Sequence, residues 1–310
     1  MEGIMAFLPK RICDALSELP EFQEECVEEI RIGTGRPLEI ISQGSCFFSS
    51  YQTQSDDAFH ILNKIGNFSM YTLEEELKQG YITVAGGHRI GLAGKVILES
   101  GKVKAIRDVS SFNIRIAREK LGIADQVAPY IYEGKWLHTM VIGAPQSGKT
   151  TLLRDLARLV STGDQKLGIG PVKAGIVDER SEIAGCVHGI PQLTLGPRVD
   201  VLDACPKAEG MMMMIRSMSP DVLIVDEIGR SEETAAIIEA ANAGITLMMT
   251  THGNSLAEIS KRPSLIPIIE SGIFQRYITM NGKSGPGMIS AIEDSNGKSI
   301  SHLKTVNTHV

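Results

Sequence analysis

The segment GAPQSGKT at residues 143–150 has the residue types and spacing of a phosphate-binding loop. It fits the pattern Gly-x-x-x-x-Gly-Lys-Ser/Thr, known as Walker A or the P-loop, and lies between an apolar run and an amphipathic one. Glycines let successive backbone N–H groups face a phosphate, and the following helix N-terminus adds partial positive charge. We therefore predict that this loop binds a nucleotide. The expected binding residues are Gly143, Ala144, Pro145, Gln146, Ser147, Gly148, Lys149, Thr150 and Thr151.

Two residues of the P-loop have separate expected tasks. Lys149 would reach the β- and γ-phosphates, and the hydroxyl of Thr150 would be a ligand of Mg²⁺. ATP and Mg²⁺ are therefore the predicted cofactors, although the pattern does not distinguish ATP from GTP.

A pair of acidic residues, Asp226 and Glu227, follows the apolar run at 222–225. A P-loop enzyme needs a carboxylate at the end of a neighbouring strand to hold Mg²⁺ through water, and a nearby group to orient the attacking water. We assign Asp226 to the metal site together with Thr150. Glu227 is the predicted general base.

The same tetrapeptide, Ile-Val-Asp-Glu, also occurs earlier and ends at Asp178 and Glu179. These carboxylates again follow an apolar run, so they could reach the metal or act as a second acid. The alternative is that they lie in an ordinary loop. The residues alone leave both interpretations open.

A third polar strand end is expected in the segment GITLMMTTHG at 244–253, which closes with Thr250, Thr251 and His252. In RecA-like P-loop enzymes a strand inserted between the other two ends in a polar residue that senses the γ-phosphate. A neutral histidine or a threonine hydroxyl suits that task by hydrogen bonding. The alternative is that His252 is a helix-capping or loop histidine.

Arginines near these strand ends are further candidates. Arg198, Arg216 and Arg230 could each contact a phosphate or a carboxylate, or form a surface ion pair. The stretch 102–120 is also basic, with six Lys or Arg against two acids. It could donate arginines to a nucleotide, form a nucleic-acid face, or be a solvated basic strand.

The elements that position these residues are expected to form two domains, 1–134 and 135–310. Residues 1–134 read as short helices, the second of them acidic and near 22–30, followed by alternating strands and a connector. After residue 135, continuous apolar strands alternate with helical segments, which is typical of a parallel sheet. The predicted fold class is α/β, a RecA-like parallel-sheet P-loop ATPase domain preceded by a small α+β domain. Expected strands lie near 137–142, 174–178, 222–226 and 245–250, and expected helices near 149–161, 206–218 and 231–243.

Composition narrows the class of protein. The net charge of −6 and the 5% aromatic content make nucleic acid an unlikely partner. The five cysteines are scattered with no Cys-x-x-Cys pair, which favours reduced thiols in a cytoplasm. No apolar run approaches the ~20 residues of a membrane span, and no basic leader opens the chain. We therefore expect a cytoplasmic location.

The order of these motifs resembles that of the type II and type IV secretion ATPases. Those enzymes carry a P-loop, an acidic box, a Walker B segment with an upstream arginine, and a histidine box. The corresponding segments here are GAPQSGKT, DERSE, RSMSPDVLIVDEIGR and TTHGN. The chain departs from the pattern at Asp226, where secretion ATPases often carry glycine.

The resemblance implies roles for individual residues. Asp178 and Glu179 fall on the acidic box, Arg216 and Glu227 on the Walker B segment, and His252 on the histidine box. Glu179, Arg216 and His252 therefore join Lys149 and Glu227 as predicted catalytic residues.

Segments such as IVDERSEIAG and the run of four methionines before Walker B are closer still to the sporulation members of this group. That resemblance implies a hexameric ATPase, peripheral to a membrane, that docks from the cytoplasm on membrane-embedded sporulation channel proteins. Its hydrolysis of ATP would energise assembly or transport of the channel during endospore formation. Arginines of the first domain, Arg107, Arg115 and Arg118, would reach the nucleotide. Alternatives are a nucleic-acid-remodelling ATPase and a nucleotide-gated scaffold with little hydrolysis.

Overall fold

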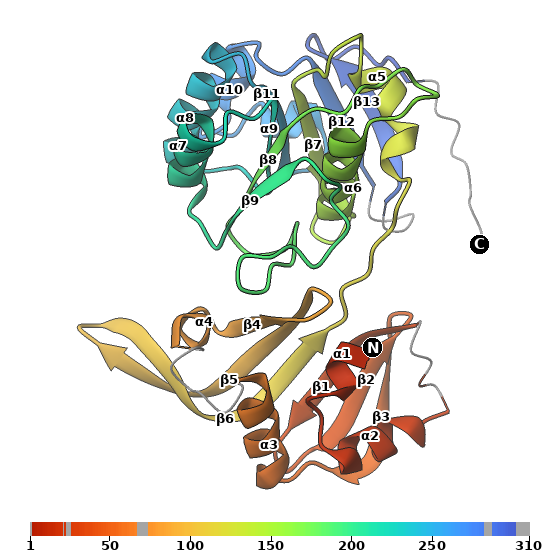
Figure 1. Cartoon of the computed structure of the whole chain (residues 1–310), viewed down its shortest axis with the longest axis vertical. Coiled ribbons are helices and arrows are strands. Elements are labelled where there is room, and N and C mark those ends of the chain that lie inside the picture. Colours follow the sequence, from red (N-terminus) through yellow and green to blue (C-terminus); the bar gives the residue numbers. More distant parts are fainter. Residues whose placement is uncertain (1, 21, 23–25, 67–73, 282–286, 302–310) are drawn as a thin grey trace. The chain divides into compact units, whose positions relative to one another are not determined.

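The chain forms two compact units, Met1–Arg118 and Glu119–Val310, in a computed structural model (Figure 1). The structure describes residues 2–20, 22, 26–66, 74–281 and 287–301. Each unit has a sheet and a hydrophobic core of its own.

The first unit is built on a six-stranded antiparallel sheet in the order β3-β2-β1-β6-β5-β4. The acidic helix expected near 22–30 is wrong, because residues from Val27 onward belong to a strand. Ile30 and Ile32 are buried and Arg31 between them is exposed, which is the two-residue period of a strand. The described elements are α1 (Glu2–Met5), α2 (Lys10–Ser17), β1 (Val27–Gly33), β2 (Pro37–Ser42), β3 (Ser45–Gln52), α3 (Ser55–Ile65), α4 (Glu74–Gln79), β4 (Tyr81–Val84), β5 (His88–Glu99) and β6 (Lys102–Arg115).

Helices α1, α2 and α3 pack on one face of this sheet and close the core of the first unit. Ile30, Ile90 and Ile114 come from three neighbouring strands and are fully buried in one cluster with side chains of these helices, such as Ile12 of α2 and Ile61 of α3. Alternate strand residues point to the other face. The core therefore covers one face of the sheet, and the other face is polar.

The three arginines of the basic stretch lie on β6 or shortly after it. Arg115 Nε is 3.4 Å from Glu29 Oε1, and Arg118 Nη2 donates to the carbonyl oxygen of Val27 over 2.5 Å. Arg107 is exposed on β6. Their expected contact with a nucleotide stays a prediction.

The second unit is built on a seven-stranded sheet in the order β13-β12-β7-β11-β10-β8-β9. All neighbouring strands from β12 to β9 are parallel, and β13 alone pairs antiparallel. None of the described helices in either unit is both long and apolar enough to cross a membrane. The elements are η2 (Ala124–Gln126), α5 (Ala128–Ile131), β7 (Thr139–Gly143), α6 (Lys149–Thr162), β8 (Ala174–Asp178), β9 (Val199–Asp203), α7 (Lys207–Ser217), β10 (Val222–Val225), α8 (Ser231–Asn242), β11 (Thr246–His252), α9 (Leu256–Ile259), α10 (Ile266–Glu270), β12 (Arg276–Met280) and β13 (Ile289–Asp294).

The connector before β7 belongs to this second unit. Val127 and Ile131 are fully buried in the same core as α6. The backbone N–H of Ala124 donates to Asp155 Oδ2 over 2.8 Å, which ties η2 to α6. The division of the chain thus precedes the connector, whereas the sequence pattern places it after residue 134.

Strand β9 is a parallel strand that the sequence pattern did not predict. Its sequence, VDVLD, carries two acids among three apolar residues, and all five side chains are half-buried. It lies at the edge of the sheet beside β8. An edge strand is covered on fewer sides than a central one, so it lacks the continuous apolar run that marks its neighbours.

The loop after β8 is held from two sides. Asp178 Oδ1 accepts the backbone N–H of Glu182, and Oδ2 accepts those of Ile183 and Ala184, each over 2.9 Å. From α6, the Arg154 side chain donates to the carbonyl oxygens of Glu182 and Ile183, both over 2.6 Å. Because α6 starts in the P-loop, these contacts fix the loop after β8 against the helix that follows the P-loop.

We expect Asp178 to make the free energy of unfolding fall as the pH rises from about 4 to about 6. Burial favours its neutral carboxyl and raises its pKa to about 6. In this pH range the folded state keeps a proton that the unfolded chain has released, and the stability gained at low pH is lost as pH passes the folded pKa. The effect is at most about 3 kcal/mol.

Urea denaturation of the wild type and of Asp178→Asn at the two ends of this range measures the effect. Asparagine does not titrate, and its amide can replace only one of the two carboxylate acceptors, so the variant should be less stable throughout. The difference in the free energy of unfolding between the wild type and the variant should shrink as the pH rises. A difference of constant size would contradict the assignment.

Candidate nucleotide-binding and catalytic site

The P-loop joins β7 to α6 at the carboxyl edge of the parallel sheet. Gly148 has φ +94°, and a side chain there would lie 2.7 Å from the backbone nitrogen of Gly287. The same Gly287 N–H donates to the carbonyl oxygen of Ser147 over 2.9 Å. A Cβ on Gly143 would lie 2.4 Å from Ser147 Oγ. Both fixed glycines of the pattern are therefore required by the close packing of this loop.

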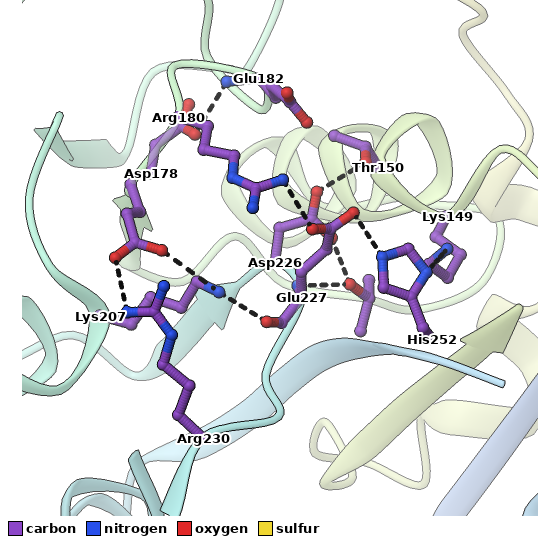
Figure 2. Close-up of polar contacts among 12 residues, drawn as sticks. Lys149, Thr150, Asp178, Arg180, Glu182, Lys207, Asp226, Glu227, Arg230 and His252 are labelled. Carbon is purple, nitrogen blue, oxygen red and sulfur yellow. Dashed lines mark hydrogen bonds and ion pairs between the residues drawn. The ribbon is translucent and has the colours of Figure 1, made fainter. Parts of the chain in front are cut away.

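Lys149 is the first residue of α6, and its ammonium group points back into the loop (Figure 2). Nζ donates to the carbonyl oxygens of Gly143 and Ala144, each over 2.9 Å, and lies 3.3 Å from His252 Nδ1. Burial lowers the pKa of Lys149, and the neighbouring carboxylates, Asp226 first, act in the opposite direction. The carboxylates thus favour a charged ammonium at the mouth of the loop.

Asp226 follows β10 and joins it to two other elements. Its Oδ2 accepts a hydrogen bond from the Thr150 hydroxyl over 2.6 Å, and its Oδ1 accepts one from the Thr250 hydroxyl on β11. The residue is 8% exposed. Thr250, which was a candidate sensor of the γ-phosphate, here holds the carboxylate in place.

The Thr150–Asp226 pair has the donor set of a magnesium–nucleotide site. Mg²⁺ prefers hard oxygen ligands and keeps waters and phosphate oxygens in its shell, so the protein supplies few ligands. Within the part of the chain that the structure describes, no cluster of three or more His, Cys, Asp or Glu side chains could hold a metal alone. The residues present fit an ion that arrives with a nucleotide.

Glu227 has an unusual backbone conformation and a fully engaged side chain. Its φ of +53° is in the left-handed region, which is costly for a residue with a long side chain and tends to occur at functional sites. Its N–H donates to Thr250 Oγ1 over 2.8 Å. Oε1 lies 3.0 Å from His252 Nε2, and Oε2 lies 3.1 Å from Arg180 Nη1 (Figure 2). Both carboxylate oxygens are therefore oriented by neighbours.

His252 stands between the ammonium of Lys149 and the carboxylate of Glu227. It is the last residue of β11, which lies between β7 and β10, as the sequence pattern predicted for the inserted strand. A neutral ring with its proton on Nε2 satisfies both contacts, because Lys149 is a donor and the carboxylate is an acceptor. The ring thus links Lys149, the predicted phosphate-binding residue, to the predicted base.

Glu179 contacts a different set of side chains from Glu227. Its Oε2 lies 3.5 Å from Lys207 Nζ, and its Oε1 lies 3.6 Å from Arg230 Nη1. Lys207 also donates to the carbonyl oxygen of Glu227 over 2.5 Å. Of the earlier acid pair, Asp178 therefore braces its own loop, and Glu179 holds a lysine against the backbone of the later pair.

Two of the candidate arginines lie away from this site within one chain. Arg216 is exposed in the last turn of α7, after which the chain returns to the start of β10. Because these strands are parallel, the start of β10 lies at their amino ends, whereas the P-loop lies at their carboxyl ends. Arg198 directly precedes β9 and therefore also lies at the amino ends of the strands. Its Nη1 donates to the carbonyl oxygen of Pro171.

A cleft of about 400 Å³ opens beside the P-loop. Arg180, Glu182 and Glu227 line it together with P-loop residues. The sequence reasoning missed Arg180 as a site residue, although it stands directly after the second acid of the DERSE segment. It also missed Arg154 and Lys207, which act on backbone carbonyl groups, a kind of contact that no motif records.

Comparison with known proteins places these features in a family. The sequence model of the family described as "Sporulation stage III, protein AA" matches residues 1–300. Stage III sporulation protein AA of Bacillus subtilis (strain 168) is 56% identical over 308 residues, which cover 99% of this chain and 100% of that protein.

Solved structures of secretion ATPases share the fold. The ATPase DotB of Legionella pneumophila aligns with a TM-score of 0.60 at 18% identity, over 88% of this chain and 76% of its own. The pilus retraction motor PilT, solved with bound ADP, aligns with a TM-score of 0.57 at 16% identity, over 87% and 76%. These likenesses confirm the predicted RecA-like α/β fold with a small preceding domain. On the family match and the 56% identical relative, the chain belongs to the sporulation stage III protein AA family.

Proposed function

We propose that the chain hydrolyses ATP with Mg²⁺ as cofactor. The observation that carries this proposal is the hydrogen bond of 2.6 Å between Thr150 and Asp226. It joins the start of the P-loop helix to a strand-end carboxylate, the two groups that position Mg²⁺ in P-loop ATPases. Lys149 and Glu227 lie on either side of His252 in the same cluster.

Nucleotide binding would use groups that now contact one another. The Lys149 ammonium, held by two loop carbonyl oxygens, is the donor available to the β- and γ-phosphates. Thr150 and Asp226 would hold Mg²⁺, which neutralises phosphate charge when bound. Arg180 and Glu182 line the same cleft and would face the nucleotide.

Glu227 is the proposed base that orients the attacking water. An acid or base contributes through its position as well as its pKa. Here the left-handed backbone, the ring of His252 and the guanidinium of Arg180 fix the carboxylate. Because both carboxylate oxygens are held, one contact must be released for water to approach. We therefore propose that the isolated chain hydrolyses ATP slowly. Slow hydrolysis is also what the alternative function, a nucleotide-gated scaffold, would show.

In the cell, we propose that hydrolysis energises assembly or transport of a membrane channel during endospore formation. The family, named for sporulation stage III, and the secretion-ATPase fold support this role. The proposed partners are membrane-embedded sporulation channel proteins, contacted from the cytoplasm. A hexamer is the proposed active form, in which Arg216 and the arginines of the first unit would act on a neighbouring copy.

Lys149→Ala and Glu227→Gln should separate binding from chemistry. The first removes the phosphate ligand, so nucleotide affinity and turnover are both expected to disappear. The second should keep Mg-ATP binding and lose about 10²- to 10⁴-fold in turnover, as expected for a general base. Phosphate release and fluorescent-nucleotide binding measure the two effects.

Lys166→Ala, which removes an exposed lysine of the loop after α6, is the matched control and should leave both quantities unchanged. Wild-type turnover in Glu227→Gln would refute the assignment of the base. Unchanged binding in Lys149→Ala would refute the site itself.

Arg180→Gln should weaken ATP binding about tenfold and leave ADP binding nearly unchanged. The guanidinium lines the cleft next to Glu227, where the terminal phosphate would lie, and a charge-assisted contact of this kind is worth about 1.4 kcal/mol or more. Competition of ATP and ADP against a fluorescent nucleotide gives the two affinities. Arg198→Gln is the control, since it removes an equal charge at a place remote from the cleft, before β9. Equal loss of ATP and ADP affinity would exclude a contact to the terminal phosphate.

The hexamer is tested by the particle mass with and without non-hydrolysable ATP. We expect the nucleotide to convert smaller species into a hexamer. Arg216→Ala should bind nucleotide normally, because Arg216 is far from the cleft in its own chain, and should lower turnover of the assembled particle. A strict monomer under both conditions would rule out action between subunits.

A further inference from the structure

The polar face of the sheet in the first unit contains a hollow of about 510 Å³, which we call the sheet hollow. This volume is within the range of ligand pockets, about 300–1,000 Å³. Cross-strand pairing places one row of its residues across five strands, from β3 through β2, β1 and β6 to β5. The row consists of Phe48, Glu39, Arg31, Asn113 and Gly91. The proposed nucleotide chemistry uses none of them.

Small residues make the hollow. Gly91 and Ala93 of β5 place no long side chain on this face, and Ser111 faces Ala93 across the strands. Gly33 has a second effect, because a Cβ there would lie 2.3 Å from Arg36 Nη2. The glycine lets the Arg36 side chain lie across the strand and into the hollow.

The hollow offers hydrogen-bond donors that are only partly used. Arg36 Nη2 donates to the neutral Ser111 hydroxyl over 2.7 Å, and no described carboxylate pairs with Arg36. Arg31 Nη1 is 3.2 Å from Glu39 Oε2 and is half exposed. A guanidinium presents a planar fork of N–H groups that matches a carboxylate. The excess of positive charge therefore favours an acidic ligand.

Two further features describe the rest of the ligand. Asn113 Oδ1 is buried and accepts no hydrogen bond from the described residues, although buried acceptors are almost always paired. This oxygen calls for an N–H donor, which a ligand can supply once the Asn113 amide turns toward the hollow that it lines. At the β3 end of the row, Phe48 is 61% exposed and offers an apolar surface. A ligand that fits all three has a carboxylate, an N–H group and an apolar side chain.

We propose that the sheet hollow binds a short acidic peptide segment of a partner protein. A Glu or Asp side chain would pair with Arg36, a backbone N–H would donate to Asn113, and an apolar side chain would cover Phe48. Five strands at about 4.8 Å spacing span roughly 19 Å, the length of five or six extended residues. This proposal is independent of the nucleotide site.

The test begins with a displayed library of random heptapeptides selected on the immobilised full chain. Enriched peptides should carry Asp or Glu beside an apolar residue. Fluorescence anisotropy with the synthetic peptide should then show at least tenfold weaker binding to Arg36→Gln and to Gly91→Leu. The second variant fills the hollow without changing charge. Its Cβ would be 3.8 Å from the nearest atoms of Asn113, so the fold can accept the side chain.

Lys104→Gln is the matched control, because it removes one positive charge of the same unit outside the hollow. It should bind the peptide like the wild type, and thermal unfolding midpoints should show that all three variants fold. No enrichment, enrichment of peptides without acids, or binding that survives Gly91→Leu would overturn the proposal. If Gly91→Leu abolishes self-association in sedimentation while no peptide is enriched, the occupant is a second copy of this chain, and the proposal is equally refuted.

Discussion

The arrangement of the candidate nucleotide site depends on the two hydroxyl hydrogen bonds that Asp226 accepts. Its oxygens hold Thr150 at the start of α6 and Thr250 on β11, so a single carboxylate joins three elements. A buried charge is costly unless it is hydrogen-bonded, and both oxygens here are. The Thr250 hydroxyl also accepts the N–H of Glu227, so it fixes the next residue as well. The position of the predicted base thus follows from the same pair of contacts.

The repeated tetrapeptide Ile-Val-Asp-Glu takes two roles because its two copies have different neighbours in the sheet. β10 lies beside β11 and near the P-loop helix, so its acids meet hydroxyl groups and a histidine. β8 lies one strand further out, beside the edge strand β9. Its aspartate meets the backbone of its own loop, and its glutamate meets Lys207. Identical local sequences therefore gain different chemistry from their position in one sheet.

The features that could be predicted from the sequence are those determined by local spacing. The P-loop, the central parallel strands and the polar ends of β10 and β11 lie where their patterns indicated. β9 escaped prediction because an edge strand need not be continuously apolar. The Arg180–Glu227 and Arg154 contacts join distant segments, so their partners depend on how the chain returns in space. Arg216 shows that closeness in sequence is not enough either. It lies ten residues before Asp226, yet its own chain places it at the opposite end of β10 from the site.

Support for the P-loop comes from a part of the chain that carries none of the nucleotide-binding motifs. The turn that leads into β13 donates the Gly287 N–H to Ser147 and occupies the space beside Gly148. A fragment ending after Asn254 would contain every motif of the site yet lack Gly287, which packs against the loop. The motifs alone therefore do not include all the residues that pack against the phosphate-binding loop.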